Sequence, residues 1–260
     1  MTNPYPLKRF GQNYLIDKNI VQKILNEFNP QPDDVVIEIG PGTGALTGEL
    51  FKLVKKLYAV EIDRRVVENL AFSFPSVHVI NQDFLKLDLN EIINEKPLRF
   101  IGNIPYNITS SILFKLIENR PLVKDVILMV QLEVAKRITA KEKSDDYGIL
   151  GVLLNFFAET KICFKIPPTV FYPRPKVESA IIYLNFEKVL PQDLDDTLFI
   201  KVVKASFGNR RKKLKNSLSN SIFKDIDFRD EDFDFSRRAE ELTINEFVEL
   251  TRIINKLLNN

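Results

Sequence analysis

The tetrapeptide Asn103-Ile104-Pro105-Tyr106 contains the residue types needed to hold a planar ring that carries an exocyclic amine. It follows a run of strand-forming residues, Leu98–Gly102, so it lies at an expected strand end. The asparagine oxygen can accept a hydrogen bond from the amine, and the tyrosine ring can stack on the heterocycle. Adenine is the obvious ring of this kind. The other interpretation is a strand that ends in an ordinary proline turn with Tyr106 in the core, and four residues alone do not decide between the two.

A glycine-rich turn follows the first expected strand, in the stretch Ile37-Glu38-Ile39-Gly40-Pro41-Gly42-Thr43-Gly44-Ala45. Glycines at a strand-to-helix junction let the backbone bend sharply and let a ligand approach it closely. The spacing fits the loose pattern G-x-G-x-x-A, so it predicts an adenosine-containing cofactor without separating NAD from other such cofactors. We expect Gly40 and Gly42 to line this cofactor site and Glu38 to order the loop.

Two acidic residues end the next two expected strands. Glu61 lies 21 residues after Gly40 and can accept hydrogen bonds from both ribose hydroxyls, although a surface acid at a strand end is the plainer interpretation. Asp83 can accept from the adenine amine of a cofactor lying across the strand ends, where open α/β sheets bind ligands. A hydride-transfer enzyme would not need the further adenine-reading group at Asn103, whereas a methyltransferase acting on adenine would. The residues therefore favour an adenine methyltransferase.

The elements that must position these residues show the pattern of an α/β protein. Short apolar runs alternate with helix-like stretches from about residue 20 to 140, which predicts a parallel sheet covered by helices on both faces. The expected strands are Val35–Ile39, Leu57–Ile62, Val77–Asn81, Phe100–Asn103 and Val126–Val130. The expected helices are Ala45–Val54, Arg65–Phe74, Ser110–Glu118 and Leu132–Ala140. Two later β-rich runs, Val152–Ile166 and Ala180–Phe186, are expected to pair antiparallel at the sheet edge.

The length of 260 residues suits one large domain and one small domain. The pattern changes near residue 188, where a proline- and aspartate-rich stretch leads into segments that are helical throughout. We therefore predict a sheet domain over residues 1–187 and an all-helical domain over residues 188–260. Thr243 and Glu246 fit a capping box that opens the last helix.

Composition excludes several classes of protein. The single cysteine, Cys163, rules out a disulfide framework and a cysteine-based metal cluster, and it fits a reducing compartment. The first residues lack the apolar stretch of a secretory signal, and no apolar run approaches about 18 residues. We expect a cytoplasmic protein that binds neither a membrane nor a metal ion. We assign no chemical role to Cys163 or to the only histidine, His78.

Basic residues are concentrated near the C-terminus although the net charge is only +2. Seven Lys and Arg residues and no acidic residue lie between Lys201 and Lys215. Such a stretch is a candidate binding surface for a polyanion such as RNA. The alternative is that it forms a solvated helix face.

Together these motifs resemble the rRNA adenine N6,N6-dimethyltransferase family of the KsgA (RsmA) type, which uses S-adenosylmethionine. The resemblance covers nearly the whole length. Its motifs are Phe10–Leu15, the glycine turn, Glu61, Asp83, Asn103–Tyr106, Phe171–Ser179, Asn209–Lys212 and Asn216–Leu218. It implies a Rossmann-like class I methyltransferase sheet, parallel with an antiparallel edge, followed by a small helical domain.

The resemblance also assigns roles to residues. It implies that S-adenosyl-L-methionine contacts Asn13, Leu15, Gly40, Glu61, Asp83 and Asn103. We expect Asn103 and the Ile104 carbonyl to hold adenine N6, with Pro105 stiffening that carbonyl, and Tyr106 and Phe171 to form an aromatic slot for the base. The residues expected to contact RNA phosphates are Lys8, Arg9, Lys176, Arg210, Arg211, Lys212 and Lys213.

The implied substrate is a pair of adjacent adenines in a hairpin near the 3′ end of small-subunit rRNA, within an assembling 30S particle. Each adenine would be dimethylated by the protein acting as a monomer. The related erythromycin-resistance methyltransferases, which modify a large-subunit adenine, are the nearest alternative. A non-catalytic RNA-binding assembly factor with the same fold is another. A DNA adenine methyltransferase is disfavoured, since those enzymes usually carry Asp at the position of Asn103.

Overall fold

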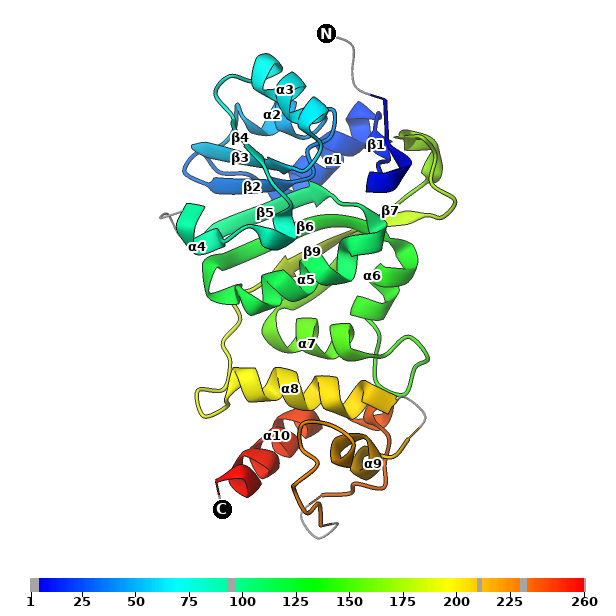
Figure 1. Cartoon of the computed structure of the whole chain (residues 1–260). Coiled ribbons are helices and arrows are strands. Elements are labelled where there is room, and N and C mark those ends of the chain that lie inside the picture. The colour runs from blue at the N-terminus through cyan, green and yellow to red at the C-terminus, as the bar shows by residue number, and fades with distance from the viewer. Residues whose placement is uncertain (1–4, 93–96, 210–211, 230–232, 260) are drawn as a thin grey trace. The chain divides into compact units, whose positions relative to one another are not determined.

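The computed structural model describes residues 5–92, 97–209, 212–229 and 233–259 (Figure 1). Its backbone contacts divide the chain into two compact units. The first comprises residues 1–135 and 158–187, and the second comprises residues 136–157 and 188–260. The chain passes from one unit to the other after residues 135, 157 and 187, so residues 136–157 group with the C-terminal helices rather than with the sheet. No helix in the described part of the chain is long and apolar enough to span a membrane.

The first unit is built on a seven-stranded sheet with the order β4-β3-β2-β5-β6-β9-β7. Strands β4, β3, β2, β5 and β6 are parallel, and β9 runs antiparallel to both β6 and β7. The strands are β2 (Val35–Ile39), β3 (Lys56–Glu61), β4 (His78–Asn81), β5 (Leu98–Asn103), β6 (Val123–Gln131), β7 (Glu159–Ile166) and β9 (Ser179–Asn185). This sheet confirms the predicted parallel arrangement with an antiparallel edge.

Helices connect the strands and cover the sheet. Helix α1 packs its Val21, Ile24, Leu25 and Phe28 onto one sheet face, where these residues join a buried apolar cluster with strand side chains. Helix α5 lies in front of the sheet in Figure 1, with α1 behind it. The helices of this unit are α1 (Lys18–Phe28), α2 (Thr47–Leu50), α3 (Arg64–Ser73), α4 (Leu89–Ile92) and α5 (Thr109–Glu118), and α6 (Leu132–Ile138) begins in it.

The register of the parallel strands brings the predicted site residues to one edge. Glu38 of β2 lies beside Ala59 of β3 and beside Ile101 of β5, so the carboxyl ends of these strands coincide. At Gly102 a Cβ would lie 2.4 Å from the carbonyl oxygen of Ile39. Only glycine therefore lets the end of β5 run this close to the start of the glycine turn, which places Asn103 next to it.

A small second sheet joins the N-terminal segment to a later loop. Strands β1 (Tyr14–Leu15) and β8 (Phe171–Tyr172) pair antiparallel, with Tyr14 opposite Tyr172 and Leu15 opposite Phe171. Because opposite residues point to the same side of a two-stranded ribbon, Leu15 and Phe171 share one side and Tyr14 and Tyr172 the other. Both Leu15 and Phe171 belong to the apolar cluster of the sheet.

The second unit is helical, as predicted for the C-terminal part of the chain. It contains α7 (Ile149–Phe157), α8 (Asp196–Ser206), α9 (Leu214–Ser219) and α10 (Ile244–Leu258). Thr243 caps α10 with both bonds of the predicted capping box, from the Glu246 N–H to its hydroxyl and from its own N–H to the Glu246 carboxylate. The aromatic rings of Phe156 and Phe199 lie 4.0 Å apart between α7 and α8.

The expected β-run Val152–Ile166 is wrong in its first half. Residues up to Phe157 form helix α7, and the strand starts only at Glu159. Six of the nine residues of α7 are buried, including neighbours that lie on different sides of the helix. A helix buried on most sides has no polar stripe, so its apolar residues do not show the helical period. The second half, Glu159–Ile166, does pair with β9 at the sheet edge as predicted.

Candidate active site

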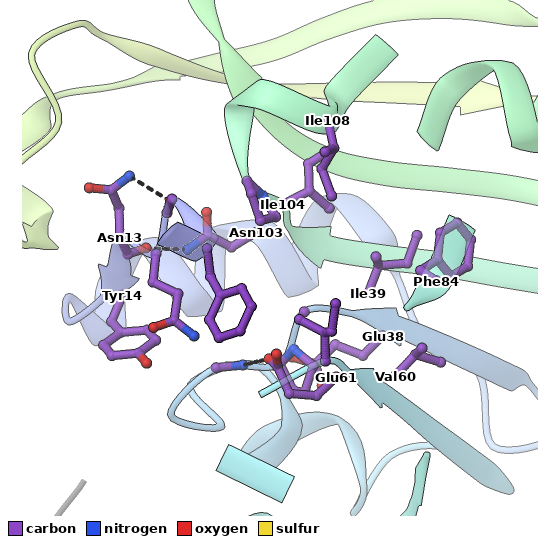
Figure 2. A pocket seen from close by; sticks show the side chains of 18 of the residues that line it. Asn13, Tyr14, Glu38, Ile39, Val60, Glu61, Phe84, Asn103, Ile104 and Ile108 are labelled. Carbon is purple, nitrogen blue, oxygen red and sulfur yellow. Dashed lines mark hydrogen bonds between the residues drawn. The ribbon is translucent and has the colours of Figure 1, made fainter. Parts of the chain in front are cut away.

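One cavity of about 220 Å³ opens at the carboxyl ends of β2, β3 and β5 in the first unit. Figure 2 shows its lining side chains arriving from the N-terminal segment, the glycine turn and the strand ends. Of the residues predicted from the sequence, it brings together Arg9, Asn13, Leu15, Glu38, Gly40, Gly42, Glu61, Asp83, Asn103, Ile104, Pro105 and Tyr106. The tetrapeptide and the glycine turn thus line the same cavity.

Asn103 has its side-chain orientation fixed by a single contact. Its amide nitrogen donates a hydrogen bond of 2.8 Å to the backbone carbonyl oxygen of Asn13 (Figure 2). Asn13 is held in turn, because its own side-chain nitrogen donates to the Gly11 carbonyl at 3.3 Å. Since the Asn103 nitrogen is engaged by an acceptor, the other end of the amide is its oxygen, which can only accept. The site therefore presents an acceptor suited to an exocyclic amine.

Glu61 is a buried carboxylate held by backbone donors. Its Oε1 accepts from the Asp63 N–H at 2.9 Å, and its Oε2 accepts a long bond of 3.4 Å from the Gly42 N–H. Burial raises the pKa of Glu61, while these backbone bonds oppose the rise. The bond to Gly42 ties the end of β3 to the glycine turn. A carboxylate held at a strand end beside this turn suits the two hydroxyls of a ribose.

The glycine turn and Tyr14 have features suited to a bound polar ligand. Gly42 adopts a φ of +54°, and a Cβ there would lie 3.0 Å from the Tyr14 ring, so a larger residue would crowd the site. The buried Tyr14 hydroxyl has no hydrogen-bond partner among the described residues. Burial raises its pKa to about 12, and the charges of Asp63 and Glu61 add to that effect. An unpaired buried donor beside a glycine cradle is what a bound polar ligand would satisfy.

Glu38 lies beneath the turn and is fully buried. Its carboxylate accepts a hydrogen bond of 2.7 Å from the Thr47 hydroxyl at the start of α2. Burial raises its pKa to about 7. Because Glu38 and Thr47 lie on either side of the glycine turn, their bond fixes the two ends of that turn relative to one another, in the manner expected from the sequence.

Asp83 begins the short 3₁₀ turn η2 (Phe84–Lys86) and reaches the cavity from the end of β4. Its carboxylate accepts from the Leu85 N–H at 2.9 Å. Lys115 of α5 donates from the other side to the Leu85 carbonyl oxygen at 3.1 Å. Both bonds are made by the backbone of Leu85, so they restrain the turn that presents Asp83.

Tyr106 forms part of the cavity wall at the start of the 3₁₀ turn η3 (Tyr106–Ile108). Its hydroxyl lies 2.6 Å from the hydroxyl oxygen of Ser179, the first residue of β9. Burial raises the pKa of Tyr106. The ring is half-buried, so one part of it packs in the protein while the rest faces the cavity.

Phe171 does not lie at the cavity, contrary to the expectation from the sequence. Its side chain is 1% exposed, belongs to the apolar cluster around α1, and is absent from the cavity lining. The strand register explains this, because Phe171 lies opposite Leu15 on the core-facing side of the β1–β8 ribbon. The neighbouring Tyr172, on the other side, is 53% exposed. The predicted aromatic slot with Phe171 as one wall is therefore not formed in this structure.

The predicted RNA-contacting residues are only partly described. Arg9 is exposed, lines the cavity and lies over the Phe10 ring, and Lys176 is exposed in the loop between β8 and β9. Lys212 and Lys213 are exposed at the start of α9 in the helical unit. Arg210 and Arg211, and the side chain of Lys8, lie outside the described residues.

Sequence reasoning missed three residues that shape the cavity. Gln12 accepts from the Leu7 N–H at 2.8 Å and donates to Asp63 at 3.3 Å, which fastens the N-terminal segment to the end of β3. Asp63 also receives the Arg65 guanidinium at 2.6 Å. Tyr14 contributes its unpaired hydroxyl. Asp63 follows Glu61 by two residues, and that spacing at a strand end was the one available signal for it.

Comparison with known proteins agrees with this geometry. Residues 7–256 match the family model described as ribosomal RNA adenine dimethylase. The chain is 45% identical to the ribosomal RNA small subunit methyltransferase A of Chlorobium phaeobacteroides, covering 96% of this chain and 92% of the relative. It is 39% identical to the protein of the same name from Clostridioides difficile, covering 95% and 90%.

Two solved structures of methyl- or dimethyladenosine-transferring enzymes are also similar to this chain. A dimethyladenosine transferase from Plasmodium falciparum superposes with a TM-score of 0.74 at 26% identity, covering 93% of this chain and 97% of the other. The 23S rRNA methyltransferase ErmE superposes with a TM-score of 0.68 at 26% identity, covering 94% and 100%. A family match over nearly the whole length, with relatives well above 30% identity, is decisive. This chain belongs to the ribosomal RNA adenine dimethylase family.

Proposed function

We propose that the protein transfers methyl groups from S-adenosyl-L-methionine to N6 of two adjacent adenines in the 3′-terminal hairpin of small-subunit (16S) rRNA, giving N6,N6-dimethyladenosine. The observation that carries this proposal is the Asn103–Asn13 hydrogen bond, which engages the amide nitrogen of a residue lining the same cavity as the glycine turn and leaves its oxygen as the acceptor. Family membership supports the reaction type.

The choice of small-subunit RNA rests on the relatives. Proteins named ribosomal RNA small subunit methyltransferase A match at 39–45% identity over at least 95% of this chain. The structure of the 23S rRNA methyltransferase ErmE matches at 26%. The higher identity to the small-subunit enzymes favours a small-subunit rRNA substrate over the large-subunit substrate of the erythromycin-resistance enzymes.

The cofactor is held by residues from four strand ends and the N-terminal segment. Glu61 would accept from the ribose hydroxyls, Asp83 from the adenine amine, and the backbone at Gly40 and Gly42 would lie against the ligand. Asn13 and Leu15 close the cavity from the N-terminal side. When bound, the cofactor supplies a methyl group on a sulfonium, which is an activated electrophile with a neutral leaving group.

Asn103 and Ile104 prepare the nucleophile. The lone pair of adenine N6 is delocalised into its ring, so the free amine is a poor nucleophile. Acceptance of its two N–H groups by the Asn103 oxygen and the Ile104 carbonyl favours a tetrahedral nitrogen and fixes its direction, and positioning of this kind contributes several kcal/mol. Pro105, with its φ of −60°, keeps the Ile104 carbonyl rigid. The methylated nitrogen is acidic enough to lose its proton to water, so the tetrapeptide needs no general base.

Tyr106 would stack on the target adenine once the base leaves its helix. Taking a base out of the stack costs a few kcal/mol, and stacking on an aromatic ring returns about 1–3 kcal/mol. Arg9 at the cavity and Lys176, together with Lys8, Arg210, Arg211, Lys212 and Lys213, would contact RNA phosphates, which position the RNA without reading its sequence. The substrate is proposed to be an assembling 30S particle in the cytoplasm, methylated by a monomer.

The test is a methylation assay that offers both substrates. Purified protein and labelled cofactor are incubated with small-subunit particles from cells lacking the protein, and separately with protein-free large-subunit RNA. Mass spectrometry should find dimethylation at the two hairpin adenines of the particle alone. Methylation of the large-subunit RNA would favour the erythromycin-resistance type. No detectable cofactor binding by calorimetry would indicate a non-catalytic assembly factor.

A further inference from the structure

We infer that Ser179 is a positioning residue for methyl transfer, because its hydroxyl fixes the ring of Tyr106 in the cavity wall. The inference rests on the proposed role of Tyr106 as the surface on which the target base stacks. Its basis is the 2.6 Å contact between the Tyr106 and Ser179 hydroxyls, which joins the residue after Pro105 to a strand 73 positions later in the chain.

Ser179 is a rigid anchor. It is fully buried, and it starts β9 in register with Gln131 of β6 on one side and Ile166 of β7 on the other. The residue before it, Glu178, accepts a backbone bond of 3.0 Å from Leu132. A hydroxyl held on an inner strand of a sheet has little freedom, so a side chain bonded to it is fixed in turn.

Tyr106, by contrast, needs an anchor. It lies in a short 3₁₀ turn, and its ring is half-buried, so packing alone restrains only part of it. A ring that must receive a flipped base gains from being held in one orientation beforehand, since ordering it on binding would cost affinity. The hydrogen bond at the far end of the ring provides that restraint.

The same bond connects the stacking surface to a second surface. Ser179 ends the loop that carries exposed Arg174 and Lys176. The loop would bind RNA phosphates, and Tyr106 would hold the target base. Three residues of chain and one hydrogen bond connect Lys176 to Tyr106, so the distance between the bound phosphates and the base would be fixed. Ser179 touches neither base nor cofactor in this arrangement, so its effect on the reaction passes through Tyr106.

A double-mutant cycle tests the inference. Ser179→Ala and Tyr106→Phe each remove the hydrogen bond, so each should lower kcat/KM for the RNA substrate about 5- to 20-fold. The double variant should be no worse than either single variant, because the bond is lost only once. The affinity for S-adenosylhomocysteine, measured by calorimetry, should stay within about twofold. The inference would be overturned if the double variant lost kcat/KM by the product of the two single losses. It would also be overturned if the affinity for S-adenosylhomocysteine fell as much as kcat/KM.

Two more variants separate a positioning role for Ser179 from a purely structural one. Ser206→Ala removes another buried serine hydroxyl, which donates to the Val202 carbonyl at 2.8 Å in the helical unit, and should leave kcat/KM unchanged. An equal loss there would mean that lost stability alone accounts for the result. Tyr106→Ala removes the ring itself and should lower kcat/KM about 100-fold. If Tyr106→Ala is harmless, the proposed stacking role fails; if it is severe while Ser179→Ala is harmless, only the inference about Ser179 fails.

Discussion

The side chain of Asn103 and the backbone of Asn13 are joined by a hydrogen bond although 90 residues separate them in the chain. The bond holds the N-terminal segment against the end of β5. It also engages the amide nitrogen of Asn103, so the remaining polar atom of that side chain is an acceptor oxygen. One contact thus links two parts of the cavity wall and engages the Asn103 nitrogen, as the proposed role of its oxygen as an acceptor requires.

Replacing Asn103 should lower the rate of catalysis while the protein still folds. Asn103→Ala removes the proposed acceptor for adenine N6, so kcat should fall about 100- to 1000-fold, as when one preorganised hydrogen-bonding group is deleted from an active site. Single-turnover methylation at saturating cofactor measures this. Asn26→Ala, an exposed asparagine on α1, is the control and should retain full activity. A kcat for Asn103→Ala within threefold of the parent would refute the assigned role.

Glu38 should make stability depend on pH. Its pKa in the folded protein is raised to about 7 by burial, above the ordinary value of 4.5. Below pH 4.5 both folded and unfolded states hold the proton, so the raised pKa has no effect. Between pH 4.5 and 7 the unfolded chain releases a proton that the folded protein keeps, so stability falls as pH rises. Above pH 7 the loss is complete and amounts to roughly 3–4 kcal/mol.

Glu38→Gln removes this titration and keeps a group that can bond to Thr47. Thermal unfolding of the parent and the variant, measured from pH 5 to pH 8, should show the parent losing stability relative to the variant as pH rises. A constant difference between the two across that range would show that Glu38 is ionised throughout in the folded protein.

Arg99 should be essential for stability but not for chemistry. Its guanidinium donates two bonds of 2.7 Å to Asp125, one of 2.6 Å to the Phe28 carbonyl, and pairs with Asp34. All of these lie near the start of β5, at the opposite end of the strand from Asn103. Because Arg99→Ala leaves the Asp125 and Asp34 carboxylates without their cationic partner, it should destabilise the protein by about 3–5 kcal/mol.

Thermal unfolding measures that loss, and kcat per folded molecule should be unchanged. Arg64→Ala is the control, since its pair with Glu68 is exposed and should contribute less than about 1 kcal/mol. Equal unfolding temperatures for the two variants would contradict the structural assignment of Arg99.

Phe171 should behave as a core residue rather than as a base-stacking residue. Phe171→Ala leaves a cavity beneath the β1–β8 ribbon and should cost about 3–5 kcal/mol of stability. Phe171→Leu nearly fills the space, so it should cost less than about 1.5 kcal/mol and keep kcat/KM within threefold. A large drop in kcat for Phe171→Leu at parental stability would mean that the ring leaves the core to reach the substrate.

The sequence predicted most of the elements that carry the site. Val35–Ile39 is a strand with the expected bounds, and the expected helix Ser110–Glu118 differs from the observed one by a single residue. These segments have a clear period or a clear apolar run bounded by turn residues. Strand ends could therefore be placed, and with them Gly40, Glu61 and Asn103.

Other features depend on contacts that no local pattern encodes. The sequence of helix α7 resembles a strand because a helix buried on most sides has no polar face. The core position of Phe171, in place of the expected base-stacking position, has no signal in the sequence because a two-residue strand is too short to show which side faces the core. The hydroxyl pair of Tyr106 and Ser179 joins distant segments, so only the tertiary structure reveals it.

Helix α7 has a practical consequence for handling this protein in pieces. The chain leaves the sheet after β6, builds one helix into the C-terminal unit, and then returns to form β7. A fragment ending at residue 187 would keep Phe156 and Phe157 but lose the Phe199 ring against which both pack. Such a fragment would expose an aromatic surface and aggregate, so chimaeras that exchange the C-terminal helices must exchange residues 136–157 as well.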